Sequence, residues 1–203
     1  MRLYYHHLAS PTVRKVRAVA FEADLVLDEI EIDYEAEQQR SSAYLALNPN
    51  AKFPTLVDGD FILWESNAIC QYLATCAPLA NLLPLDNERA RTDVTRWQCW
   101  ELSHFSPSVQ KLLQTRSSMP SLDPSADEKA DAEFRRYATV LDHHLRGRRF
   151  ISGEQRTIAD FCMASMLMYV DKARIPLVDF VDIARWFEGV QALAGWRRSQ
   201  PQA

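Results

Sequence analysis

The stretch from Asn48 to Ser66, NPNAKFPTLVDGDFILWES, limits the possible folds of this chain more than any other. A proline-containing loop leads into a short apolar run, Asp58-Gly59 supplies the positive-φ pair of a tight type I′ turn, and a second apolar run returns. This order predicts a β-hairpin. The apolar-periodic segment 67–73 follows, and Ser66 is a suitable N-cap for that helix because its hydroxyl can accept an unpaired backbone N–H.

The same stretch has the groups that would bind an anionic peptide. A helix start with a serine hydroxyl and unpaired amides is an anion site. Upstream, the Lys52-Phe53-Pro54 turn can present backbone amide and carbonyl groups to an extended chain, and Pro54 is a candidate for a cis peptide bond. Each part also has an ordinary structural explanation, as a turn, a hairpin or a capped helix. Their order and spacing together favour a clamp for a small anionic peptide.

In this order and spacing, the stretch resembles the glutathione S-transferase superfamily. The superfamily pattern has Asn-Pro, then a lysine and a proline in a turn, then leucine, Asp-Gly, and Glu-Ser at a helix start. The matching residues here are Asn48, Pro49, Lys52, Pro54, Leu56, Asp58, Gly59, Glu65 and Ser66. The resemblance covers nearly the whole chain.

The expected elements of the first eighty residues agree with that resemblance. Residues 2–5 predict a strand, Ser10-Pro11 is a helix start with proline at the first helical position, and 29–33 alternates as a half-buried strand. A weakly helical segment, 35–47, precedes the hairpin. A right-handed crossover makes the first two strands parallel, and the Asp-Gly turn makes the last pair antiparallel. The prediction is an α/β thioredoxin-like domain, a mixed four-stranded sheet with helices on both faces.

Composition changes near the end of this segment, so we expect two domains. Residues 1–77 form the thioredoxin-like, glutathione-binding domain, and 78–87, with prolines, asparagines and aspartate, form a linker. Residues 88–203 form an all-α domain that contributes the electrophile pocket. Within it, 161–170 is almost wholly apolar and predicts a buried central helix, while 117–125, with two prolines, predicts a loop.

The start of that buried helix carries a structural signal. Thr157-Ile158-Ala159-Asp160 is similar to a capping box, with Thr157 as the N-cap and Asp160 reaching back to its amide. Together with Gly153, these residues also match the capping motif of the superfamily's helical domain. We therefore predict a structural role for Thr157 and Asp160.

Composition argues against several classes of protein. The chain has 203 residues with 23 basic and 27 acidic side chains, a net charge of −4, which argues against a nucleic-acid partner. There is no apolar run of eighteen residues for a membrane span and no secretory signal at the N-terminus, so a cytoplasmic location is expected. The cysteines lack metal-ligand spacing and the adjacent histidine pairs are expected to diverge, so no metal site is predicted.

The resemblance implies glutathione as a co-substrate and no permanently bound cofactor. A cysteine-like thiol has a pKa of about 8.5, so only a few per cent is thiolate at pH 7. A hydroxyl bonded to the sulfur beside a helix N-terminus favours the anion. Ser10-x-x-x-Arg14 resembles the start of the first helix in bacterial serine-type members, so Ser10 is the expected catalytic residue. Ser-Pro is also an ordinary N-cap pair. Tyr4 and Tyr5 are rivals for this role, because other branches use a tyrosine near the first strand, and backbone amides are a further alternative.

Residue by residue, the resemblance also implies a glutathione clamp. The implied binding residues are Gln39, Arg40, Lys52, Phe53, Pro54, Glu65 and Ser66. Glu65 and Ser66 would take the γ-glutamyl end, and the backbone of Phe53 would pair with the cysteinyl amide. The other polar residues would serve the glycine carboxylate, although a solvated helix face is an equal alternative for Gln39 and Arg40.

We expect the electrophile pocket between the domains, with His7, Trp100, His104 and Phe105 at or near it. His104 is similar in context to a histidine of the bacterial beta class. The chain departs from that class because Ser10 stands where the beta-class cysteine would be, so a histidine that packs in the core is the favoured alternative for His104.

The leading hypothesis is a glutathione transferase of detoxification type, which adds the glutathione thiolate to small hydrophobic electrophiles. The alternatives are a glutathione-dependent isomerase or thiol reductase, and a non-catalytic binding or regulatory module of the same fold. The resemblance further implies a homodimer.

Overall fold

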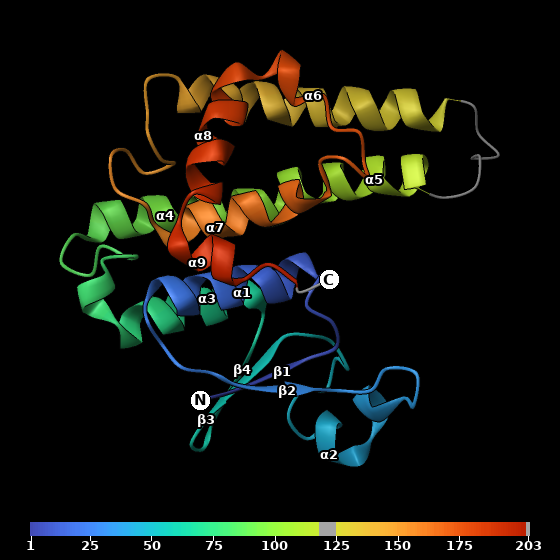
Figure 1. Cartoon of the computed structure of the whole chain (residues 1–203), viewed down its shortest axis with the longest axis vertical. Coiled ribbons are helices and arrows are strands. Elements are labelled where there is room, and N and C mark those ends of the chain that lie inside the picture. The colour runs from blue at the N-terminus through green and yellow to red at the C-terminus, as the bar shows by residue number, and fades with distance from the viewer. Residues whose placement is uncertain (118–124, 202–203) are drawn as a thin grey trace. The chain divides into compact units, whose positions relative to one another are not determined.

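The computed structural model describes residues 1–117 and 125–201, and these form two compact units (Figure 1). One unit comprises Met1–Leu83 together with the described residues from Leu193 onward, and the other comprises Pro84–Ala192. The expected helical domain, 88–203, therefore differs from the helical unit at its C-terminal end, which belongs to the unit that contains the sheet. The loop expected at 117–125 lies almost wholly outside the described residues.

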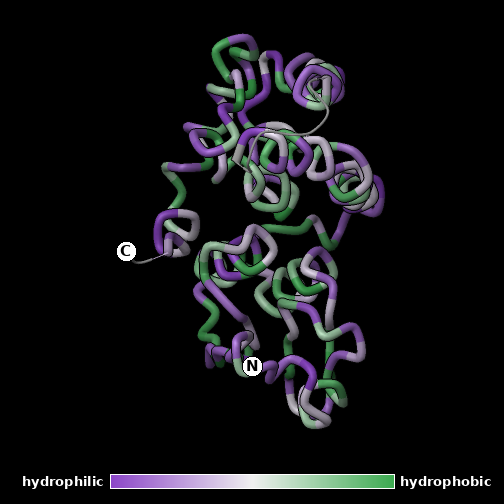
Figure 2. The backbone as a smooth tube through the Cα atoms, turned by 90° about the vertical axis from the view of Figure 1, so that its right-hand side faces the viewer, coloured by the Kyte–Doolittle hydropathy of each residue, from purple (hydrophilic) through white to green (hydrophobic). Residues whose placement is uncertain are grey.

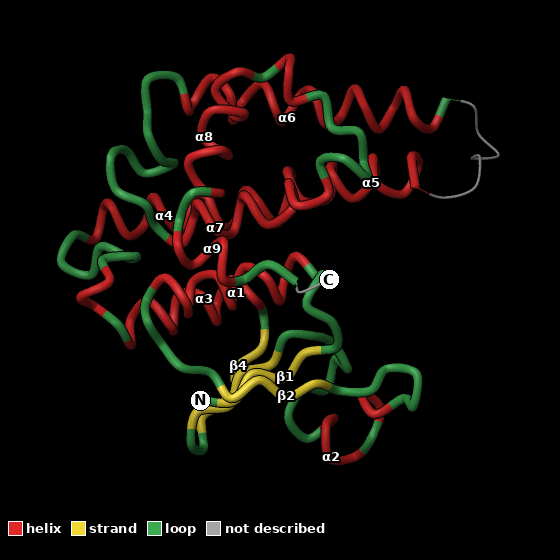
Figure 3. The backbone as a smooth tube through the Cα atoms, viewed as in Figure 1, coloured by secondary structure: helices red, strands yellow, loops and turns green. Residues whose placement is uncertain are grey.

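The first unit contains a mixed four-stranded sheet, as predicted (Figure 3). Its strands are β1 (Arg2–Tyr5), β2 (Asp28–Glu31), β3 (Thr55–Asp58) and β4 (Phe61–Trp64). The order across the sheet is β2-β1-β3-β4, with β1 and β2 parallel and the other pairs antiparallel. This is the thioredoxin-like arrangement that the strand-helix-strand and hairpin patterns indicated.

Helices cover this sheet and join its strands. Helices α1 and α3 pack against each other on one face (Figure 1). The helical segments of this unit are α1 (Pro11–Glu22), a 3₁₀ turn (Gln38–Arg40), α2 (Ser42–Leu45), α3 (Ser66–Cys76), a 3₁₀ turn (Pro78–Ala80) and α9 (Ala194–Arg198).

Two details of the hairpin differ from the prediction. Asp58 pairs with Phe61, so the two-residue loop is Gly59-Asp60 rather than Asp58-Gly59, and only Gly59 has a positive φ, of 62°, as in a type II′ turn. The helix after the hairpin begins at Ser66 itself, with Glu65 in the N-cap position. Helix α3 thus begins one residue earlier than predicted, and the hydroxyl of Ser66 lies on its first turn.

The polar face of α1 is buried. Arg14, Lys15 and Arg17 lie opposite Val13 and Val16 in the helical period, yet each is at most 7% exposed. The distant C-terminal segment contacts the two arginines, and Lys15 donates to Asn67 Oδ1 at 2.9 Å. A charged side chain can be buried when its charge is paired or hydrogen-bonded, and local sequence does not reveal a partner so far along the chain.

Partners for the two arginines come from helix α9, from Ser199 just after it and from strand β2. The guanidinium of Arg14 lies 4.1 Å from the ring centroid of Trp196, a cation–π contact. Arg17 donates to Glu29 Oε1 at 2.6 Å and to the Ser199 carbonyl at 3.1 Å. Gly195 permits the close approach, because a Cβ there would lie 2.3 Å from the carbonyl oxygen of Ala18.

The second unit is helical, and its described residues contain one isolated β-bridge, Phe150–Gly153, but no strand. Hydrophilic and hydrophobic residues alternate within the helical turns of the chain (Figure 2), the pattern of amphipathic helices. Its helical segments are α4 (Glu88–Trp100), a π-helical turn (Glu101–Phe105), α5 (Ser106–Ser117), α6 (Ala126–Leu145), α7 (Ile158–Ala164), 3₁₀ turns (Ser165–Tyr169 and Leu177–Asp179) and α8 (Val181–Gln191). Among the described helices, none has both the length and the apolar character that a membrane crossing needs.

The π-helical turn between α4 and α5 has an identifiable cause. Pro107 has no backbone N–H and crowds the preceding turn. The N–H of Ser106 bonds to the carbonyl of Glu101, five residues back. The wider turn lets the helix continue past the proline instead of ending there.

The capping box is confirmed. Thr157 is the N-cap of α7, and its backbone N–H donates to Asp160 Oδ2 at 2.8 Å. The apolar segment that follows is buried from Ile158 to Leu167, but the α-helix ends at Ala164 and the last three residues of the predicted helix, 168–170, are half-buried.

Candidate active site

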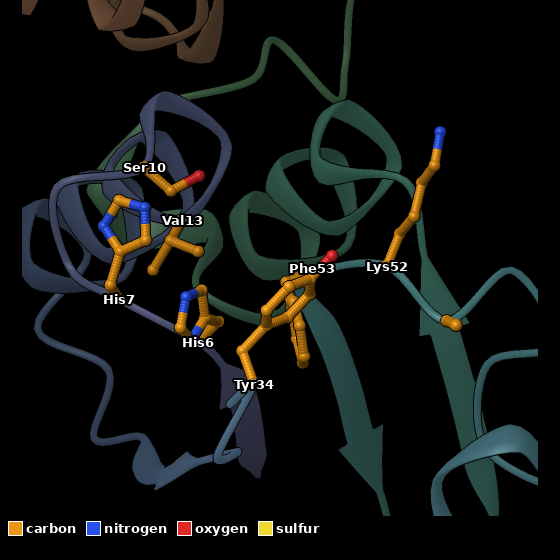
Figure 4. Close-up of a pocket in the computed structure, with 8 residues that line it drawn as sticks. His6, His7, Ser10, Val13, Tyr34, Lys52 and Phe53 are labelled. Atoms are coloured by element: carbon orange, nitrogen blue, oxygen red, sulfur yellow. The ribbon is translucent and has the colours of Figure 1, made fainter. Parts of the chain in front are cut away.

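A cavity of about 230 Å³ lies within the sheet unit, where the loop after β1 faces the loop before β3 (Figure 4). Its lining residues are His6, His7, Ser10, Val13, Tyr34, Ala51, Lys52 and Phe53. Figure 4 shows the hydroxyl of Ser10 directed toward the space in front of Phe53, whereas the side chain of Lys52 extends away from it. The structure thus brings together four of the residues singled out from the sequence, Ser10, His7, Lys52 and Phe53.

Ser10 is held at the start of α1 without using its hydroxyl as a cap. It is the N-cap residue in extended conformation (φ −78°, ψ 130°), and its carbonyl accepts from the Arg14 N–H at 2.8 Å. Its side chain makes no cap hydrogen bond, and Ser10 Oγ instead lies 2.9 Å from Thr12 Oγ1. The hydroxyl therefore stands at a helix N-terminus and faces a cavity, where it can bond to an anion.

The facing loop contains a cis Phe53–Pro54 peptide bond, as the sequence suggested. Two side chains fix this loop. Tyr44 Oη donates to the Lys52 carbonyl at 2.7 Å, and Asn48 Nδ2 donates to the same carbonyl at 2.9 Å. Burial raises the pKa of Tyr44 to about 12, so the phenol keeps its proton and remains a donor at neutral pH.

The hairpin register places Glu65 and Ser66 beside this loop. Thr55, which follows Pro54, pairs with Trp64, which precedes Glu65. Ser66 is buried on the first turn of α3, and Glu65 has a positive φ of 73°. The cis-proline turn and the start of α3 therefore lie at the same end of the hairpin, as a clamp requires.

The residues expected to bind the glycine carboxylate of glutathione are only partly found at the cavity. Arg40 is exposed and pairs with Glu37 at 3.0 Å, and Gln39 is buried with no hydrogen-bond partner for its Oε1. Neither side chain lines the Ser10 cavity. Lys52 is solvent-exposed and is the one of these three residues that lines the cavity.

His6 and Tyr34 also line the cavity and were not selected from the sequence. The ring of His6 lies 4.8 Å from that of Tyr34 and 5.2 Å from that of His7, centroid to centroid. The two histidines were expected to diverge, yet the loop after β1 turns both toward one space. Burial and the neighbouring His6 lower the pKa of His7, so its imidazole is neutral at pH 7. Tyr34 follows β2, and only the parallel pairing of β2 with β1 brings it here.

The tyrosine rivals occupy the strand, as expected. Tyr4 and Tyr5 belong to β1, and neither lines the cavity that contains Ser10. Tyr4 packs edge-to-face against Tyr44 at 6.1 Å. Burial, followed by Glu31 and Glu29, raises the pKa of Tyr5.

The pocket residues expected from the helical unit form an aromatic cluster there. His104 stacks on Tyr137 with ring centroids 5.1 Å apart, and Trp100 lies 6.1 Å from the His104 ring. Both are half-buried. Phe105 is fully buried in this unit, with its ring 6.1 Å from that of Phe134, centroid to centroid.

The chain consists of a thioredoxin-like unit and a helical unit. The first contains a cis-proline loop, a serine hydroxyl at the start of the first helix and a hairpin that leads into Glu-Ser. Together these features define a class of glutathione-binding folds. Family models agree. The model "Glutathione S-transferase, N-terminal domain" matches residues 2–75, and "Glutathione S-transferase, C-terminal domain" matches residues 110–199. The chain belongs to the glutathione S-transferase superfamily.

Individual relatives are similar over almost the full length. Glutathione S-transferase 3 of Zea mays is 29% identical over 200 residues, 94% of this chain and 89% of the relative. Among solved structures, a glutathione transferase family member of Pseudomonas fluorescens pf-5 with two glutathione bound has a TM-score of 0.88 at 25% identity, covering 98% of this chain and 91% of that one. The glutathione transferase URE2P6 of Phanerochaete chrysosporium, in complex with oxidized glutathione, has a TM-score of 0.87 at 25% identity, covering 98% and 93%.

Proposed function

We propose that this enzyme transfers alkyl or aryl groups from small hydrophobic electrophiles to glutathione, and that the Ser10 hydroxyl stabilises the thiolate. The observation that carries this proposal is the Ser10 hydroxyl, which is not used as a cap and faces the cavity lined by Phe53. The backbone of Phe53 pairs with the cysteinyl residue, Glu65 and Ser66 bind the γ-glutamyl group, and Lys52 serves the glycine carboxylate.

Geometry and electrostatics both support thiolate formation at this position. Glutathione held along the cis-proline turn, with its γ-glutamyl group at Ser66, directs its sulfur toward the start of α1. The partial positive charge of the helix N-terminus and the hydroxyl of Ser10 both favour the anion over the thiol. The enzyme needs no covalent nucleophile of its own, since it holds an activated thiolate and an electrophile in contact.

The experiment that tests this proposal measures binding and turnover with the whole chain. We expect retention on immobilised glutathione, elution by free glutathione, and conjugation of a chlorinated dinitrobenzene followed by product absorbance. Calorimetry with S-methylglutathione, which lacks the reactive thiol, measures binding alone. No heat of binding at millimolar ligand and no turnover would contradict the proposal and favour a non-catalytic module.

A second activity, reduction of disulfides by glutathione, is favoured by a specific observation. One structural neighbour has two glutathione molecules bound, and another is in complex with oxidized glutathione. In that reaction two glutathione thiols are oxidised to one disulfide, while a substrate disulfide takes up two electrons and two protons. Turnover of hydroxyethyl disulfide, coupled to glutathione reductase, distinguishes this activity from transfer to an electrophile.

We also propose a homodimer, for which β4 supplies part of the interface. This edge strand exposes three large apolar side chains, Phe61, Ile62 and Trp64, at 45%, 38% and 40%. An exposed apolar edge strand is a site for association. The double variant Ile62→Lys/Trp64→Lys is expected to halve the mass measured by light scattering. The exposed Val26→Lys is the matched control, and a variant that keeps the dimer mass would exclude this strand from the interface.

A further inference from the structure

Thr12 connects the two halves of the candidate site. Its Oγ1 lies 2.9 Å from Ser10 Oγ and 3.4 Å from the carbonyl oxygen of Phe53. Thr12 is the second residue of α1, and Phe53 lies 41 positions further along the chain. One hydroxyl therefore touches both the proposed thiolate-stabilising group and the backbone group proposed to pair with the cysteinyl residue.

The number of protons limits how these contacts can be made. A hydroxyl has one proton to donate and two lone pairs that accept. The carbonyl of Phe53 can only accept, so the contact at 3.4 Å uses the proton of Thr12. The Ser10–Thr12 contact must then use the proton of Ser10, and that proton points at Thr12 instead of the cavity. In this arrangement Ser10 presents only lone pairs to an incoming sulfur.

Bound glutathione removes this restriction. In the proposed binding mode the cysteinyl N–H donates to the Phe53 carbonyl, and this second donor weakens the Thr12 contact, which is already long at 3.4 Å. The Thr12 hydroxyl can then rotate and donate its proton to Ser10 Oγ. Ser10 becomes free to direct its own proton to the sulfur, and a chain of two donors ends on the thiolate. No proton passes between the two hydroxyls, and the thiol proton leaves to solvent.

We propose that Thr12 is a positioning residue, whose hydroxyl turns the Ser10 proton toward the glutathione sulfur once the cysteinyl amide occupies the Phe53 carbonyl. This inference rests on the proposed function of Ser10 and adds the group that sets the direction of its hydrogen bond.

Thr12→Val tests the proposal, because valine keeps the shape of threonine and removes only the hydroxyl. We expect the apparent pKa of the bound thiol, from the pH dependence of kcat/KM and from thiolate absorbance, to rise by roughly half to one unit. The value of kcat/KM below that pKa should fall about three- to tenfold, and the two profiles should converge at high pH. Thr12→Ser, which keeps the hydroxyl, should restore the wild-type profile.

The Ser10→Ala background provides the second measurement. There, Thr12→Val should cause no further change, because its effect acts through Ser10. A Thr12→Val profile that overlays the wild type, a loss equal at all pH values, or an undiminished loss in the Ser10→Ala background would each overturn the proposal. These outcomes leave the proposed function standing, whereas a wild-type chain that does not bind glutathione overturns both.

Discussion

Replacement of Ser10 by alanine, which leaves the helix N-terminus in place, is expected to lower kcat/KM for glutathione conjugation about ten- to a hundredfold at neutral pH. A hydrogen bond to the sulfur and the adjacent helix N-terminus together shift a thiol pKa by roughly two units, and two units correspond to about 2.7 kcal/mol. Removing the hydroxyl should move the apparent pKa of the bound thiol back toward about 8.5. The measurement is the pH profile of kcat/KM, with the electrophile saturating.

Two variants control for this result. Ser10→Thr keeps the hydroxyl and should retain most of the activity. Ser41→Ala removes a serine hydroxyl that caps α2 through the Tyr44 N–H at 3.2 Å, outside the cavity, and should leave the thiol pKa unchanged. If Ser10→Ala kept the wild-type profile, thiolate stabilisation would have to come from Tyr5, His7 or backbone amides.

Replacement of Asp160 by alanine is expected to lower the free energy of unfolding by about 3–5 kcal/mol. A cap alone would contribute roughly 1–2 kcal/mol. The larger effect follows from the contacts of this fully buried carboxylate. It accepts from the Ile151 N–H at 2.9 Å, the Thr157 N–H at 2.8 Å and Trp186 Nε1 at 2.9 Å. Alanine would leave these donors without their acceptor inside the protein.

Urea unfolding, followed by fluorescence, measures this effect. Asp160→Asn keeps the volume but turns one oxygen into a donor that faces other donors, so a loss of about half as much is expected. Asp60→Ala, in the exposed hairpin turn, is the matched control and should change stability by less than about 0.5 kcal/mol. A loss below about 1 kcal/mol for Asp160→Ala would contradict the assigned network.

The candidate site shows which signals a single sequence carries. The cis-proline turn, the hairpin and Glu65-Ser66 lie within 19 consecutive residues. Their mutual position depends on local chain geometry, so it could be predicted from the sequence pattern. His6 and Tyr34 follow different strands, and only the parallel β1–β2 pairing turns them toward one cavity. Thr12 looked like an ordinary polar residue at a helix start, because its contact with Phe53 depends on the loop across the cavity.

The sequence by itself determined the hairpin, the order of strands and helices, the capping box at Thr157 and the buried helix after it. Each of these depends on residues a few positions apart, which interact whatever the rest of the chain does. Only the tertiary structure decided that α1 buries its cations, because the partners of Arg14 and Arg17 stand at Trp196 and Ser199, up to 182 residues away. A charged residue without a known partner is expected to be exposed, and only the folded chain brings such a partner to it.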